Sequence, residues 1–293
     1  MIALDAEEVC LLAPAKLTTK LKIAGRRADG YHLLEAEMVS VSLYDEVRLF
    51  QRESLSSSRV SISDPGGLQA MGFEMREIPQ GSSNLVTRAL ALAGVQADIE
   101  LVKRIPPGAG LGGGSADAAA VLRRFGHRGD VAEVAALGAD VPFCLQVDRA
   151  KVRGIGEDVE RLENEKARFV LFLVPVLSPT KAVYHAFDEL GVGAGATDCD
   201  GRVSNDLEVA ALSLSPTLAR YRDFISSFVI GRPQMAGSGS TFFVPGDFAS
   251  HGLGDVHLAS GIPSMVFRDG SLVVLGLEVR EVTIGEVVAT AGL

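Results

Sequence analysis

Five glycines within seven residues, from Gly108 to Gly114, constrain the fold of this chain more than any other feature. The loop follows the pair Pro106-Pro107 and runs directly into the alanine-rich segment 116–125. Glycines let a backbone turn tightly and come close to a ligand. The free N–H groups at the start of a following helix, together with the helix dipole, favour an anion. The sequence therefore predicts a phosphate-binding loop between a strand and a helix.

Other interpretations of this loop are weaker. Gly108, Gly110 and Gly113 fit the GxGxxG fingerprint of dinucleotide-binding folds. In those folds a strand leads straight into the first glycine, and a second strand ends in an acidic residue about 20 residues later. Here two prolines intervene, and residues 125–130 do not have the pattern of a strand. No Lys-Ser/Thr pair follows the glycines, so the loop is not a Walker A motif. A plain flexible linker seldom lies between a strand and an alanine-rich helix.

Composition excludes several classes of protein. The net charge of −9, without a run of Lys or Arg, argues against nucleic-acid and anionic-membrane partners. No apolar run approaches the ~20 residues that span a bilayer. The three scattered cysteines suggest neither a zinc site nor a disulfide framework. Residues 1–8 lack the basic and apolar regions of a signal peptide, so we expect a cytoplasmic protein.

Residue patterns along the chain predict strands and helices without a regular βαβ rhythm, which favours an α+β fold. The predicted strands cover residues 9–21 (interrupted at 13–16), 37–50, 59–63, 98–103 and 169–174. The predicted helices cover residues 85–92, 116–125, 131–137, 182–190 and 217–229. Loops are expected at 64–80 and 191–201, and Asp269-Gly270 predicts a hairpin between 266 and 279. A weakly marked boundary divides the chain into residues 1–150 and 151–293.

The loop motif is accompanied by four other segments in a fixed order. They are Pro14-Ala15-Lys16-Leu17 with Gly25-Arg26-Arg27-Ala28-Asp29-Gly30-Tyr31-His32, Gly138-Ala139-Asp140-Val141-Pro142-Phe143, Ser204-Asn205-Asp206-Leu207-Glu208, and Met235-Ala236-Gly237-Ser238-Gly239-Ser240. The loop resembles the phosphate-binding motif of the GHMP kinases. The whole set resembles the diphosphocytidyl-methylerythritol kinases within that superfamily, over residues 13 to 244.

The resemblance implies a two-lobed GHMP kinase fold, with N- and C-terminal kinase domains and the active site in the cleft between them. It implies transfer of the γ-phosphoryl group of ATP, with Mg²⁺, to the 2-hydroxyl of 4-diphosphocytidyl-methylerythritol, a step of the non-mevalonate isoprenoid route. Another GHMP kinase, acting on a sugar, homoserine or a mevalonate-type alcohol, is the main alternative. A silent nucleotide sensor and an RNA-binding module are less favoured, the latter because of the charge. A monomer and a homodimer are both compatible with the sequence.

The resemblance also implies roles for individual residues. Lys16 and Asp140 would be catalytic: Asp140 would accept the hydroxyl proton, and Lys16 would stabilise its charge and the charge that develops during transfer. The residues expected to bind ATP are Asn84, Pro106, Gly108, Gly110, Leu111, Gly112, Gly113, Gly114 and Ser115, and Ser115 is also a candidate Mg²⁺ ligand. The residues expected to bind the substrate are Thr18, Tyr31, His32, Thr180, Tyr184, Gly237, Ser238 and Gly239.

Several of these residues also have simpler structural explanations. Asp140, two residues before Pro142, and Asn84 fit helix N-caps. Tyr184 could be a core residue on a helix face. Three departures from the family pattern are visible: Thr18 stands where the family usually has Asn, Ala116 stands where it has a second serine, and the stretch between the phosphate helix and Asp140 is short. The first puts a substrate-hydroxyl contact in doubt.

Overall fold

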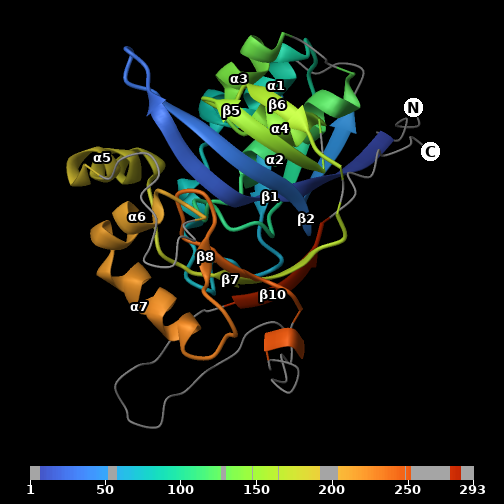
Figure 1. Ribbon diagram of the computed structural model, residues 1–293. Helices are drawn as coiled ribbons and strands as arrows, with labels where there is room; N and C mark the ends of the chain where they lie inside the picture. Colours follow the sequence, from blue (N-terminus) through green and yellow to red (C-terminus); the bar gives the residue numbers. More distant parts are fainter. Residues whose placement is uncertain are drawn as a thin grey trace, which may run out of the picture.

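The computed structural model describes residues 7–51, 58–126, 130–146, 148–163, 165–191, 204–247, 249–251 and 278–284. These residues form two β-sheets, each accompanied by helices (Figure 1). The first sheet has six strands in the order β3-β4-β2-β5-β6, with β1 paired to β2. The second has four strands in the order β10-β7-β9-β8. The α+β class expected from the sequence is confirmed.

A long antiparallel hairpin of β1 and β2 dominates the first sheet. Its pairing runs from Glu7 opposite Gln51 to Arg26 opposite His32. The strands of this sheet are β1 (Glu7–Arg26), β2 (His32–Gln51), β3 (Arg59–Ser63), β4 (Asp98–Val102), β5 (Arg149–Gly154) and β6 (Asp158–Arg161). The tip of the hairpin is therefore the turn that joins Arg26 to His32.

The predicted interruption of the first strand at residues 13–16 is wrong. β1 continues through Pro14, with a register shift between Pro14 and Ala15 that is one of three along its pairing with β2. A bulge accommodates a residue that cannot donate a ladder hydrogen bond without ending the strand. The backbone N–H of Lys16 then donates to the carbonyl of Leu111 at 3.0 Å, which ties β1 to the glycine loop.

Four helices belong to the first sheet (Figure 1). They are α1 (Leu85–Leu92), α2 (Gly113–Arg124), α3 (Val131–Leu137) and α4 (Val141–Gln146). α2 is the central one, and its residues from Ser115 to Leu122 are all buried. It begins at Gly113, three residues before the predicted start, and is preceded by Gly112, whose left-handed φ of 67° glycine adopts easily. α4 was predicted only through the alternative interpretation of Asp140 as a helix N-cap.

The second sheet carries the remaining helices. These are α5 (Thr180–Leu190), α6 (Glu208–Leu214) and α7 (Pro216–Ser226), beside β7 (Arg168–Leu173), β8 (Gln234–Met235), β9 (Phe242–Pro245) and β10 (Glu278–Thr283). β7 is buried along five of its six residues, as its uninterrupted apolar run predicts. α6 was not predicted, and α7 ends three residues before the predicted end. Residues 192–201 of the expected loop, and the predicted hairpin apart from residues 278–279, lie outside the described residues.

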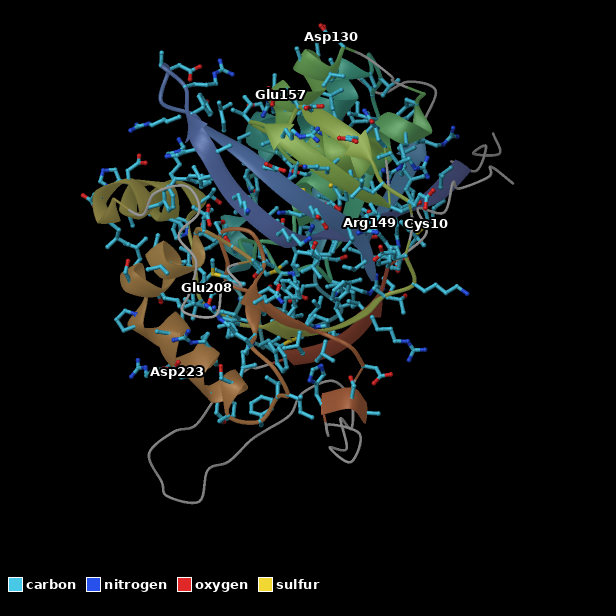
Figure 2. All side chains as sticks on the ribbon, viewed as in Figure 1. Cys10, Asp130, Arg149, Glu157, Glu208 and Asp223 are labelled. Carbon is cyan, nitrogen blue, oxygen red and sulfur yellow. The ribbon has the colours of Figure 1, made fainter. Side chains whose placement is uncertain are left out.

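The expected boundary at residue 150 falls inside β5. β5 pairs with β2, and β6 pairs with β5, so both extend the first sheet. Arg149, labelled in Figure 2, opens β5, whereas Glu208 opens α6 in the second half of the molecule. We propose that the division between the two lobes lies after Arg161. Among the described residues, no helix is both long and apolar enough to cross a membrane.

Candidate active site

One cleft, of about 1520 Å³, is lined by residues of both lobes. Of the site residues expected from the sequence, the cleft lining includes Lys16, Thr18, Tyr31, His32, Asn84, Pro106, Gly108, Gly110, Gly112, Gly113, Gly114, Ser115, Asp140, Thr180, Tyr184, Gly237 and Ser238. Leu111 and Gly239 are absent from the lining, and Leu111 is instead 1% exposed in the core. Residues far apart in the sequence thus meet around one space.

The glycine loop has the backbone shape that only glycine adopts easily. Gly108, Gly110 and Gly112 have φ angles of 69°, 79° and 67°. A side chain on Gly110 would place its Cβ 2.3 Å from the carbonyl oxygen of Ala236 and 2.8 Å from that of Gly239. The loop is therefore pressed against the second lobe, and its far end opens α2 towards the cleft.

Lys16 and Asp140 lie together beside this loop. Lys16 Nζ is 3.4 Å from Asp140 Oδ2, and the two side chains are 6% and 29% exposed. A Cβ on Gly112 would lie 2.8 Å from Lys16 Cγ, so the glycine makes room for the lysine. Lys16 Nζ also donates to Thr18 Oγ1 at 3.1 Å. Thr18, which departs from the family pattern, is thus a partner of the lysine.

A buried ionic cluster supports the loop from behind. Lys103 Nζ, 3% exposed, contacts Asp45 Oδ2 and lies 2.7 Å from Asp117 Oδ2. Asp45 Oδ1 accepts from the backbone N–H groups of Arg104 and Ile105, at 2.6 and 2.8 Å. Asp45 lies on β2, Lys103 directly follows β4, and Asp117 lies on α2. The cluster therefore connects the segments that precede and follow the glycine loop to β2. Removing its single cation would leave two buried carboxylates without compensation.

The cluster contains one carboxylate more than it has cations. Burial, reinforced by the charge of Asp45, raises the pKa of Asp117 to about 7, although Lys103 acts in the opposite direction. Asp117 Oδ1 is buried and has no hydrogen-bond partner among the described residues. Burial lowers the pKa of Lys103, but the two carboxylates outweigh it and the net shift is upward.

We expect Asp117→Asn to change how stability depends on pH. Between the unfolded pKa of 3.8 and the folded value of about 7, folded Asp117 keeps a proton that the unfolded chain releases. The wild type therefore loses this contribution to stability as the pH rises through that window. The free energy of unfolding of the variant, minus that of the wild type, should rise from about pH 4 to about pH 7 and then level off. Urea unfolding at stepped pH measures it, and a pH-independent difference would contradict the assignment.

Gly237 and Ser238, from the segment between Met235 and Gly239, form the wall of the cleft on the side of the second lobe. Asn205 Nδ2 donates to the carbonyls of Met235 and Gly237, both at 2.7 Å. Ser178 Oγ donates to the Ser238 carbonyl at 2.6 Å. Thr180 Oγ1 and Ser238 Oγ are hydrogen bonded at 3.0 Å. This wall is held by side chains of its own lobe.

At the other end of the cleft, the hairpin tip of the first lobe meets α5 of the second. The rings of His32 and Tyr184 have centroids 4.8 Å apart with a tilt of 32°. Tyr31 is 61% exposed, so it is not packed on the core. Burial, and secondarily the negative charge of Asp140, raises the pKa of Tyr184 to about 12. Asp188 joins the group through Nε2 of His32, at 2.7 Å.

Some expected residues also have purely local partners. Asn84 caps α1, because its Oδ1 accepts from Val86 N–H and its Nδ2 donates to the Pro79 carbonyl, both at 2.8 Å. Cys144 is buried, and burial raises the pKa of its thiol to about 12, so we expect it to be unreactive.

Sequence patterns alone missed Asp45, Lys103, Asn205 and Asp188 as parts of the site. Asn205 stood in a recognised segment, but without an assigned role. The other three residues, Asp45, Lys103 and Asp188, can be recognised as parts of the site only because their charged side chains are buried or form ion pairs with distant residues. The sequence alone does not reveal such a pair, because Asp45 and Lys103 are 58 residues apart.

Comparisons with known proteins agree with this geometry. Residues 83–146, from α1 through the glycine loop to α4, match the family described as GHMP kinases N terminal domain. The 4-diphosphocytidyl-2-C-methyl-D-erythritol kinase of Polaromonas sp. is 35% identical over 79% of this chain and 81% of its own length. The kinase of the same name from Paracoccus denitrificans is 36% identical over 81% of this chain and 86% of its own.

Solved structures give the same result. A crystal structure of 4-(cytidine 5'-diphospho)-2C-methyl-D-erythritol kinase matches with a TM-score of 0.59 and 33% identity, over 80% of this chain and 89% of that one. Mevalonate kinase of L. major matches with a TM-score of 0.60 at 10% identity, over 96% and 97% of the two chains, which shows the shared fold alone. The cleft, the ordered motifs and these similarities together show that the chain belongs to the 4-diphosphocytidyl-2-C-methyl-D-erythritol kinase family of GHMP kinases.

Proposed function

We propose that this protein transfers the γ-phosphoryl group of ATP to the 2-hydroxyl of 4-diphosphocytidyl-2-C-methyl-D-erythritol. The observation that carries the proposal is the pairing of Lys16 with Asp140, at 3.4 Å, beside a glycine loop that opens a buried helix. At the far end of the same cleft, His32 and Tyr184 offer a polar edge and a ring face for a base. The names of the relatives give the substrate its identity.

In the proposed mechanism, the phosphates of ATP lie at the glycine loop and the start of α2. Backbone N–H groups there, and the positive end of the helix dipole, stabilise negative charge on the phosphate oxygens. The acceptor hydroxyl lies next to Asp140, whose carboxylate takes the proton as the new P–O bond forms. Lys16, 3.4 Å from that carboxylate, stabilises its charge and the charge that develops on the transferred group.

Mg²⁺ is part of this proposal as a companion of ATP. The described residues contain no group of three or more His, Cys, Asp or Glu side chains that could hold a metal by themselves. Mg²⁺ typically keeps several waters and binds through substrate phosphates plus one or two protein oxygens. The Ser115 hydroxyl, at the start of α2 in the cleft lining, fits that limited role. When bound, Mg²⁺ would neutralise charge on the phosphate oxygens.

The test is ADP release by purified protein supplied with Mg-ATP and 4-diphosphocytidyl-2-C-methyl-D-erythritol. Release that depends on this alcohol supports the proposal. Release that occurs only with a sugar, homoserine or a mevalonate-type alcohol would replace it with another GHMP kinase activity. Nucleotide binding without turnover on any alcohol would indicate a sensor, and would contradict the roles of Lys16 and Asp140.

A further inference from the structure

Asp188 lies in the cleft lining but takes no part in the phosphate chemistry. It stands on α5, in the second lobe. Its Oδ1 is 2.7 Å from Nε2 of His32, and its Oδ2 is 3.3 Å from Nη1 of Arg26. Arg26 ends β1 and His32 begins β2, so one carboxylate connects α5 to both sides of the hairpin tip. Figure 1 shows α5 on the same side of the molecule as this tip.

The imidazole of His32 is held in a defined orientation. Its side chain is 10% exposed. Its ring lies 4.8 Å from the ring of Tyr184 and 6.1 Å from that of Phe187, the latter edge-on at 84°. Tyr184 and Asp188 are four residues apart on α5 and therefore share a helix face. The same face thus restricts both the plane of the imidazole and its rotation within that plane.

In the neutral imidazole, the contact with Asp188 also determines which nitrogen carries the proton. An ionised carboxylate can only accept hydrogen bonds, so the 2.7 Å contact requires a proton on Nε2. A neutral imidazole has one proton only. Nδ1 is then left with a lone pair, and it is an acceptor.

We propose that Asp188 is a positioning residue for base selection: it holds His32 in the Nε2–H tautomer, so that Nδ1 accepts a hydrogen bond from the exocyclic amino group of a cytosine. This inference rests on the proposed function, which places a cytidine conjugate in the cleft. Cytosine carries an amino donor at the position where uracil carries a carbonyl acceptor. Nδ1 of His32, held as an acceptor, forms a hydrogen bond with the cytosine amino group. With uracil, the same lone pair faces the lone pairs of a carbonyl oxygen, which is unfavourable.

The expected selectivity follows from that difference. One well-placed base contact typically discriminates by about 10- to 100-fold. Asp188→Asn keeps the size of the side chain but supplies an amide that can donate as well as accept. When the amide donates to Nε2, the proton moves to Nδ1, which becomes a donor suited to the uracil carbonyl. The variant should therefore lose about 10-fold or more in preference for cytosine.

Two measurements test this inference. The first is the ¹⁵N chemical shifts of His32 in the wild-type protein at about pH 8, which report the tautomer directly. The second is calorimetric binding of cytidine 5'-diphosphate and uridine 5'-diphosphate to the wild type, Asp188→Asn and Glu189→Gln. Glu189 is the matched control: it pairs with His185 at 3.5 Å on the exposed side of α5, where the two side chains are 68% and 74% exposed.

We expect the Nε2–H tautomer, a preference for cytidine diphosphate in the wild type and in Glu189→Gln, and a reduced preference in Asp188→Asn. An Nδ1–H tautomer in the wild type would overturn the inference. So would an Asp188→Asn protein that weakens both ligands equally, because this indicates a structural role only. A protein that prefers the cytidine ligand but phosphorylates no alcohol would contradict the proposed function alone. Turnover of the cytidine conjugate with an unchanged ratio in Asp188→Asn would contradict this inference alone.

Discussion

An Asp140→Asn enzyme is expected to release ADP about 10²- to 10⁴-fold more slowly than the wild type, because a positioned general base contributes about that much to a proton transfer. The asparagine has the same shape, so the cleft and the glycine loop should be unchanged. The amide is not a base, however, and it carries no charge for Lys16 to compensate. We expect the fall to be in kcat, with the KM for ATP within a few-fold of the wild type, as measured by coupled ADP release at saturating alcohol.

Asp130→Asn is the matched control for this experiment. Asp130 caps α3, where its carboxylate accepts from Ala132 N–H, and it does not line the cleft. It is labelled at the edge of the molecule in Figure 2. Asparagine is as good an N-cap as aspartate, so this variant should keep near wild-type activity. A kcat in Asp140→Asn that remains within 10-fold of the wild type would rule out Asp140 as the base.

Gly110→Ala is expected to have the largest effect on the glycine loop. A left-handed φ costs a residue with a side chain about 1–2 kcal/mol. The new Cβ would also lie 2.3 Å from the Ala236 carbonyl, a contact that forces backbone to move. Overpacking of this kind typically costs a further ~1–3 kcal/mol. We therefore expect a loss of about 2–5 kcal/mol in the free energy of unfolding, measured in urea, together with weakened ATP binding.

Gly94→Ala separates these two causes. Gly94 also has a left-handed φ, of 68°, but a Cβ there would meet no atom of the described part of the chain within 4 Å. It follows α1, outside the cleft lining. This variant should show the backbone cost alone, with normal ATP binding. Equal destabilisation by the two substitutions would mean that the contact between the glycine loop and Ala236 is unimportant for stability.

Local sequence predicted the elements that carry their own signals. The Asn84 cap predicted the start of α1, and the apolar run 169–174 predicted the buried β7. Elements whose formation depends on distant partners were missed. β5 and β6 are short and polar, and they form because β2 offers its open edge. The break predicted at Pro14 failed for the same reason, since pairing with β2 carries β1 through the bulge.

The site divides in a similar way. The ordered motifs predict that Lys16, Asp140 and the glycine loop lie around one cleft, and the structure brings these residues together. The groups that hold the loop and the hairpin tip, such as Lys103 and Asp188, act through pairs separated by many residues. No local sequence pattern predicts such a pair.

The contact between the glycine loop and the second lobe affects which lobes of related proteins can be combined in a chimera. Gly110 there faces the carbonyls of Ala236 and Gly239, which are main-chain atoms. Main-chain atoms do not change with the sequence. A first lobe taken from a relative with glycine at position 110 should therefore make the same contact with the carbonyls of residues 236 and 239. The contact of Arg26 with Asp188 depends instead on two particular side chains. Chimeras between relatives should therefore fit at the nucleotide end of the cleft and fail first at the hairpin tip.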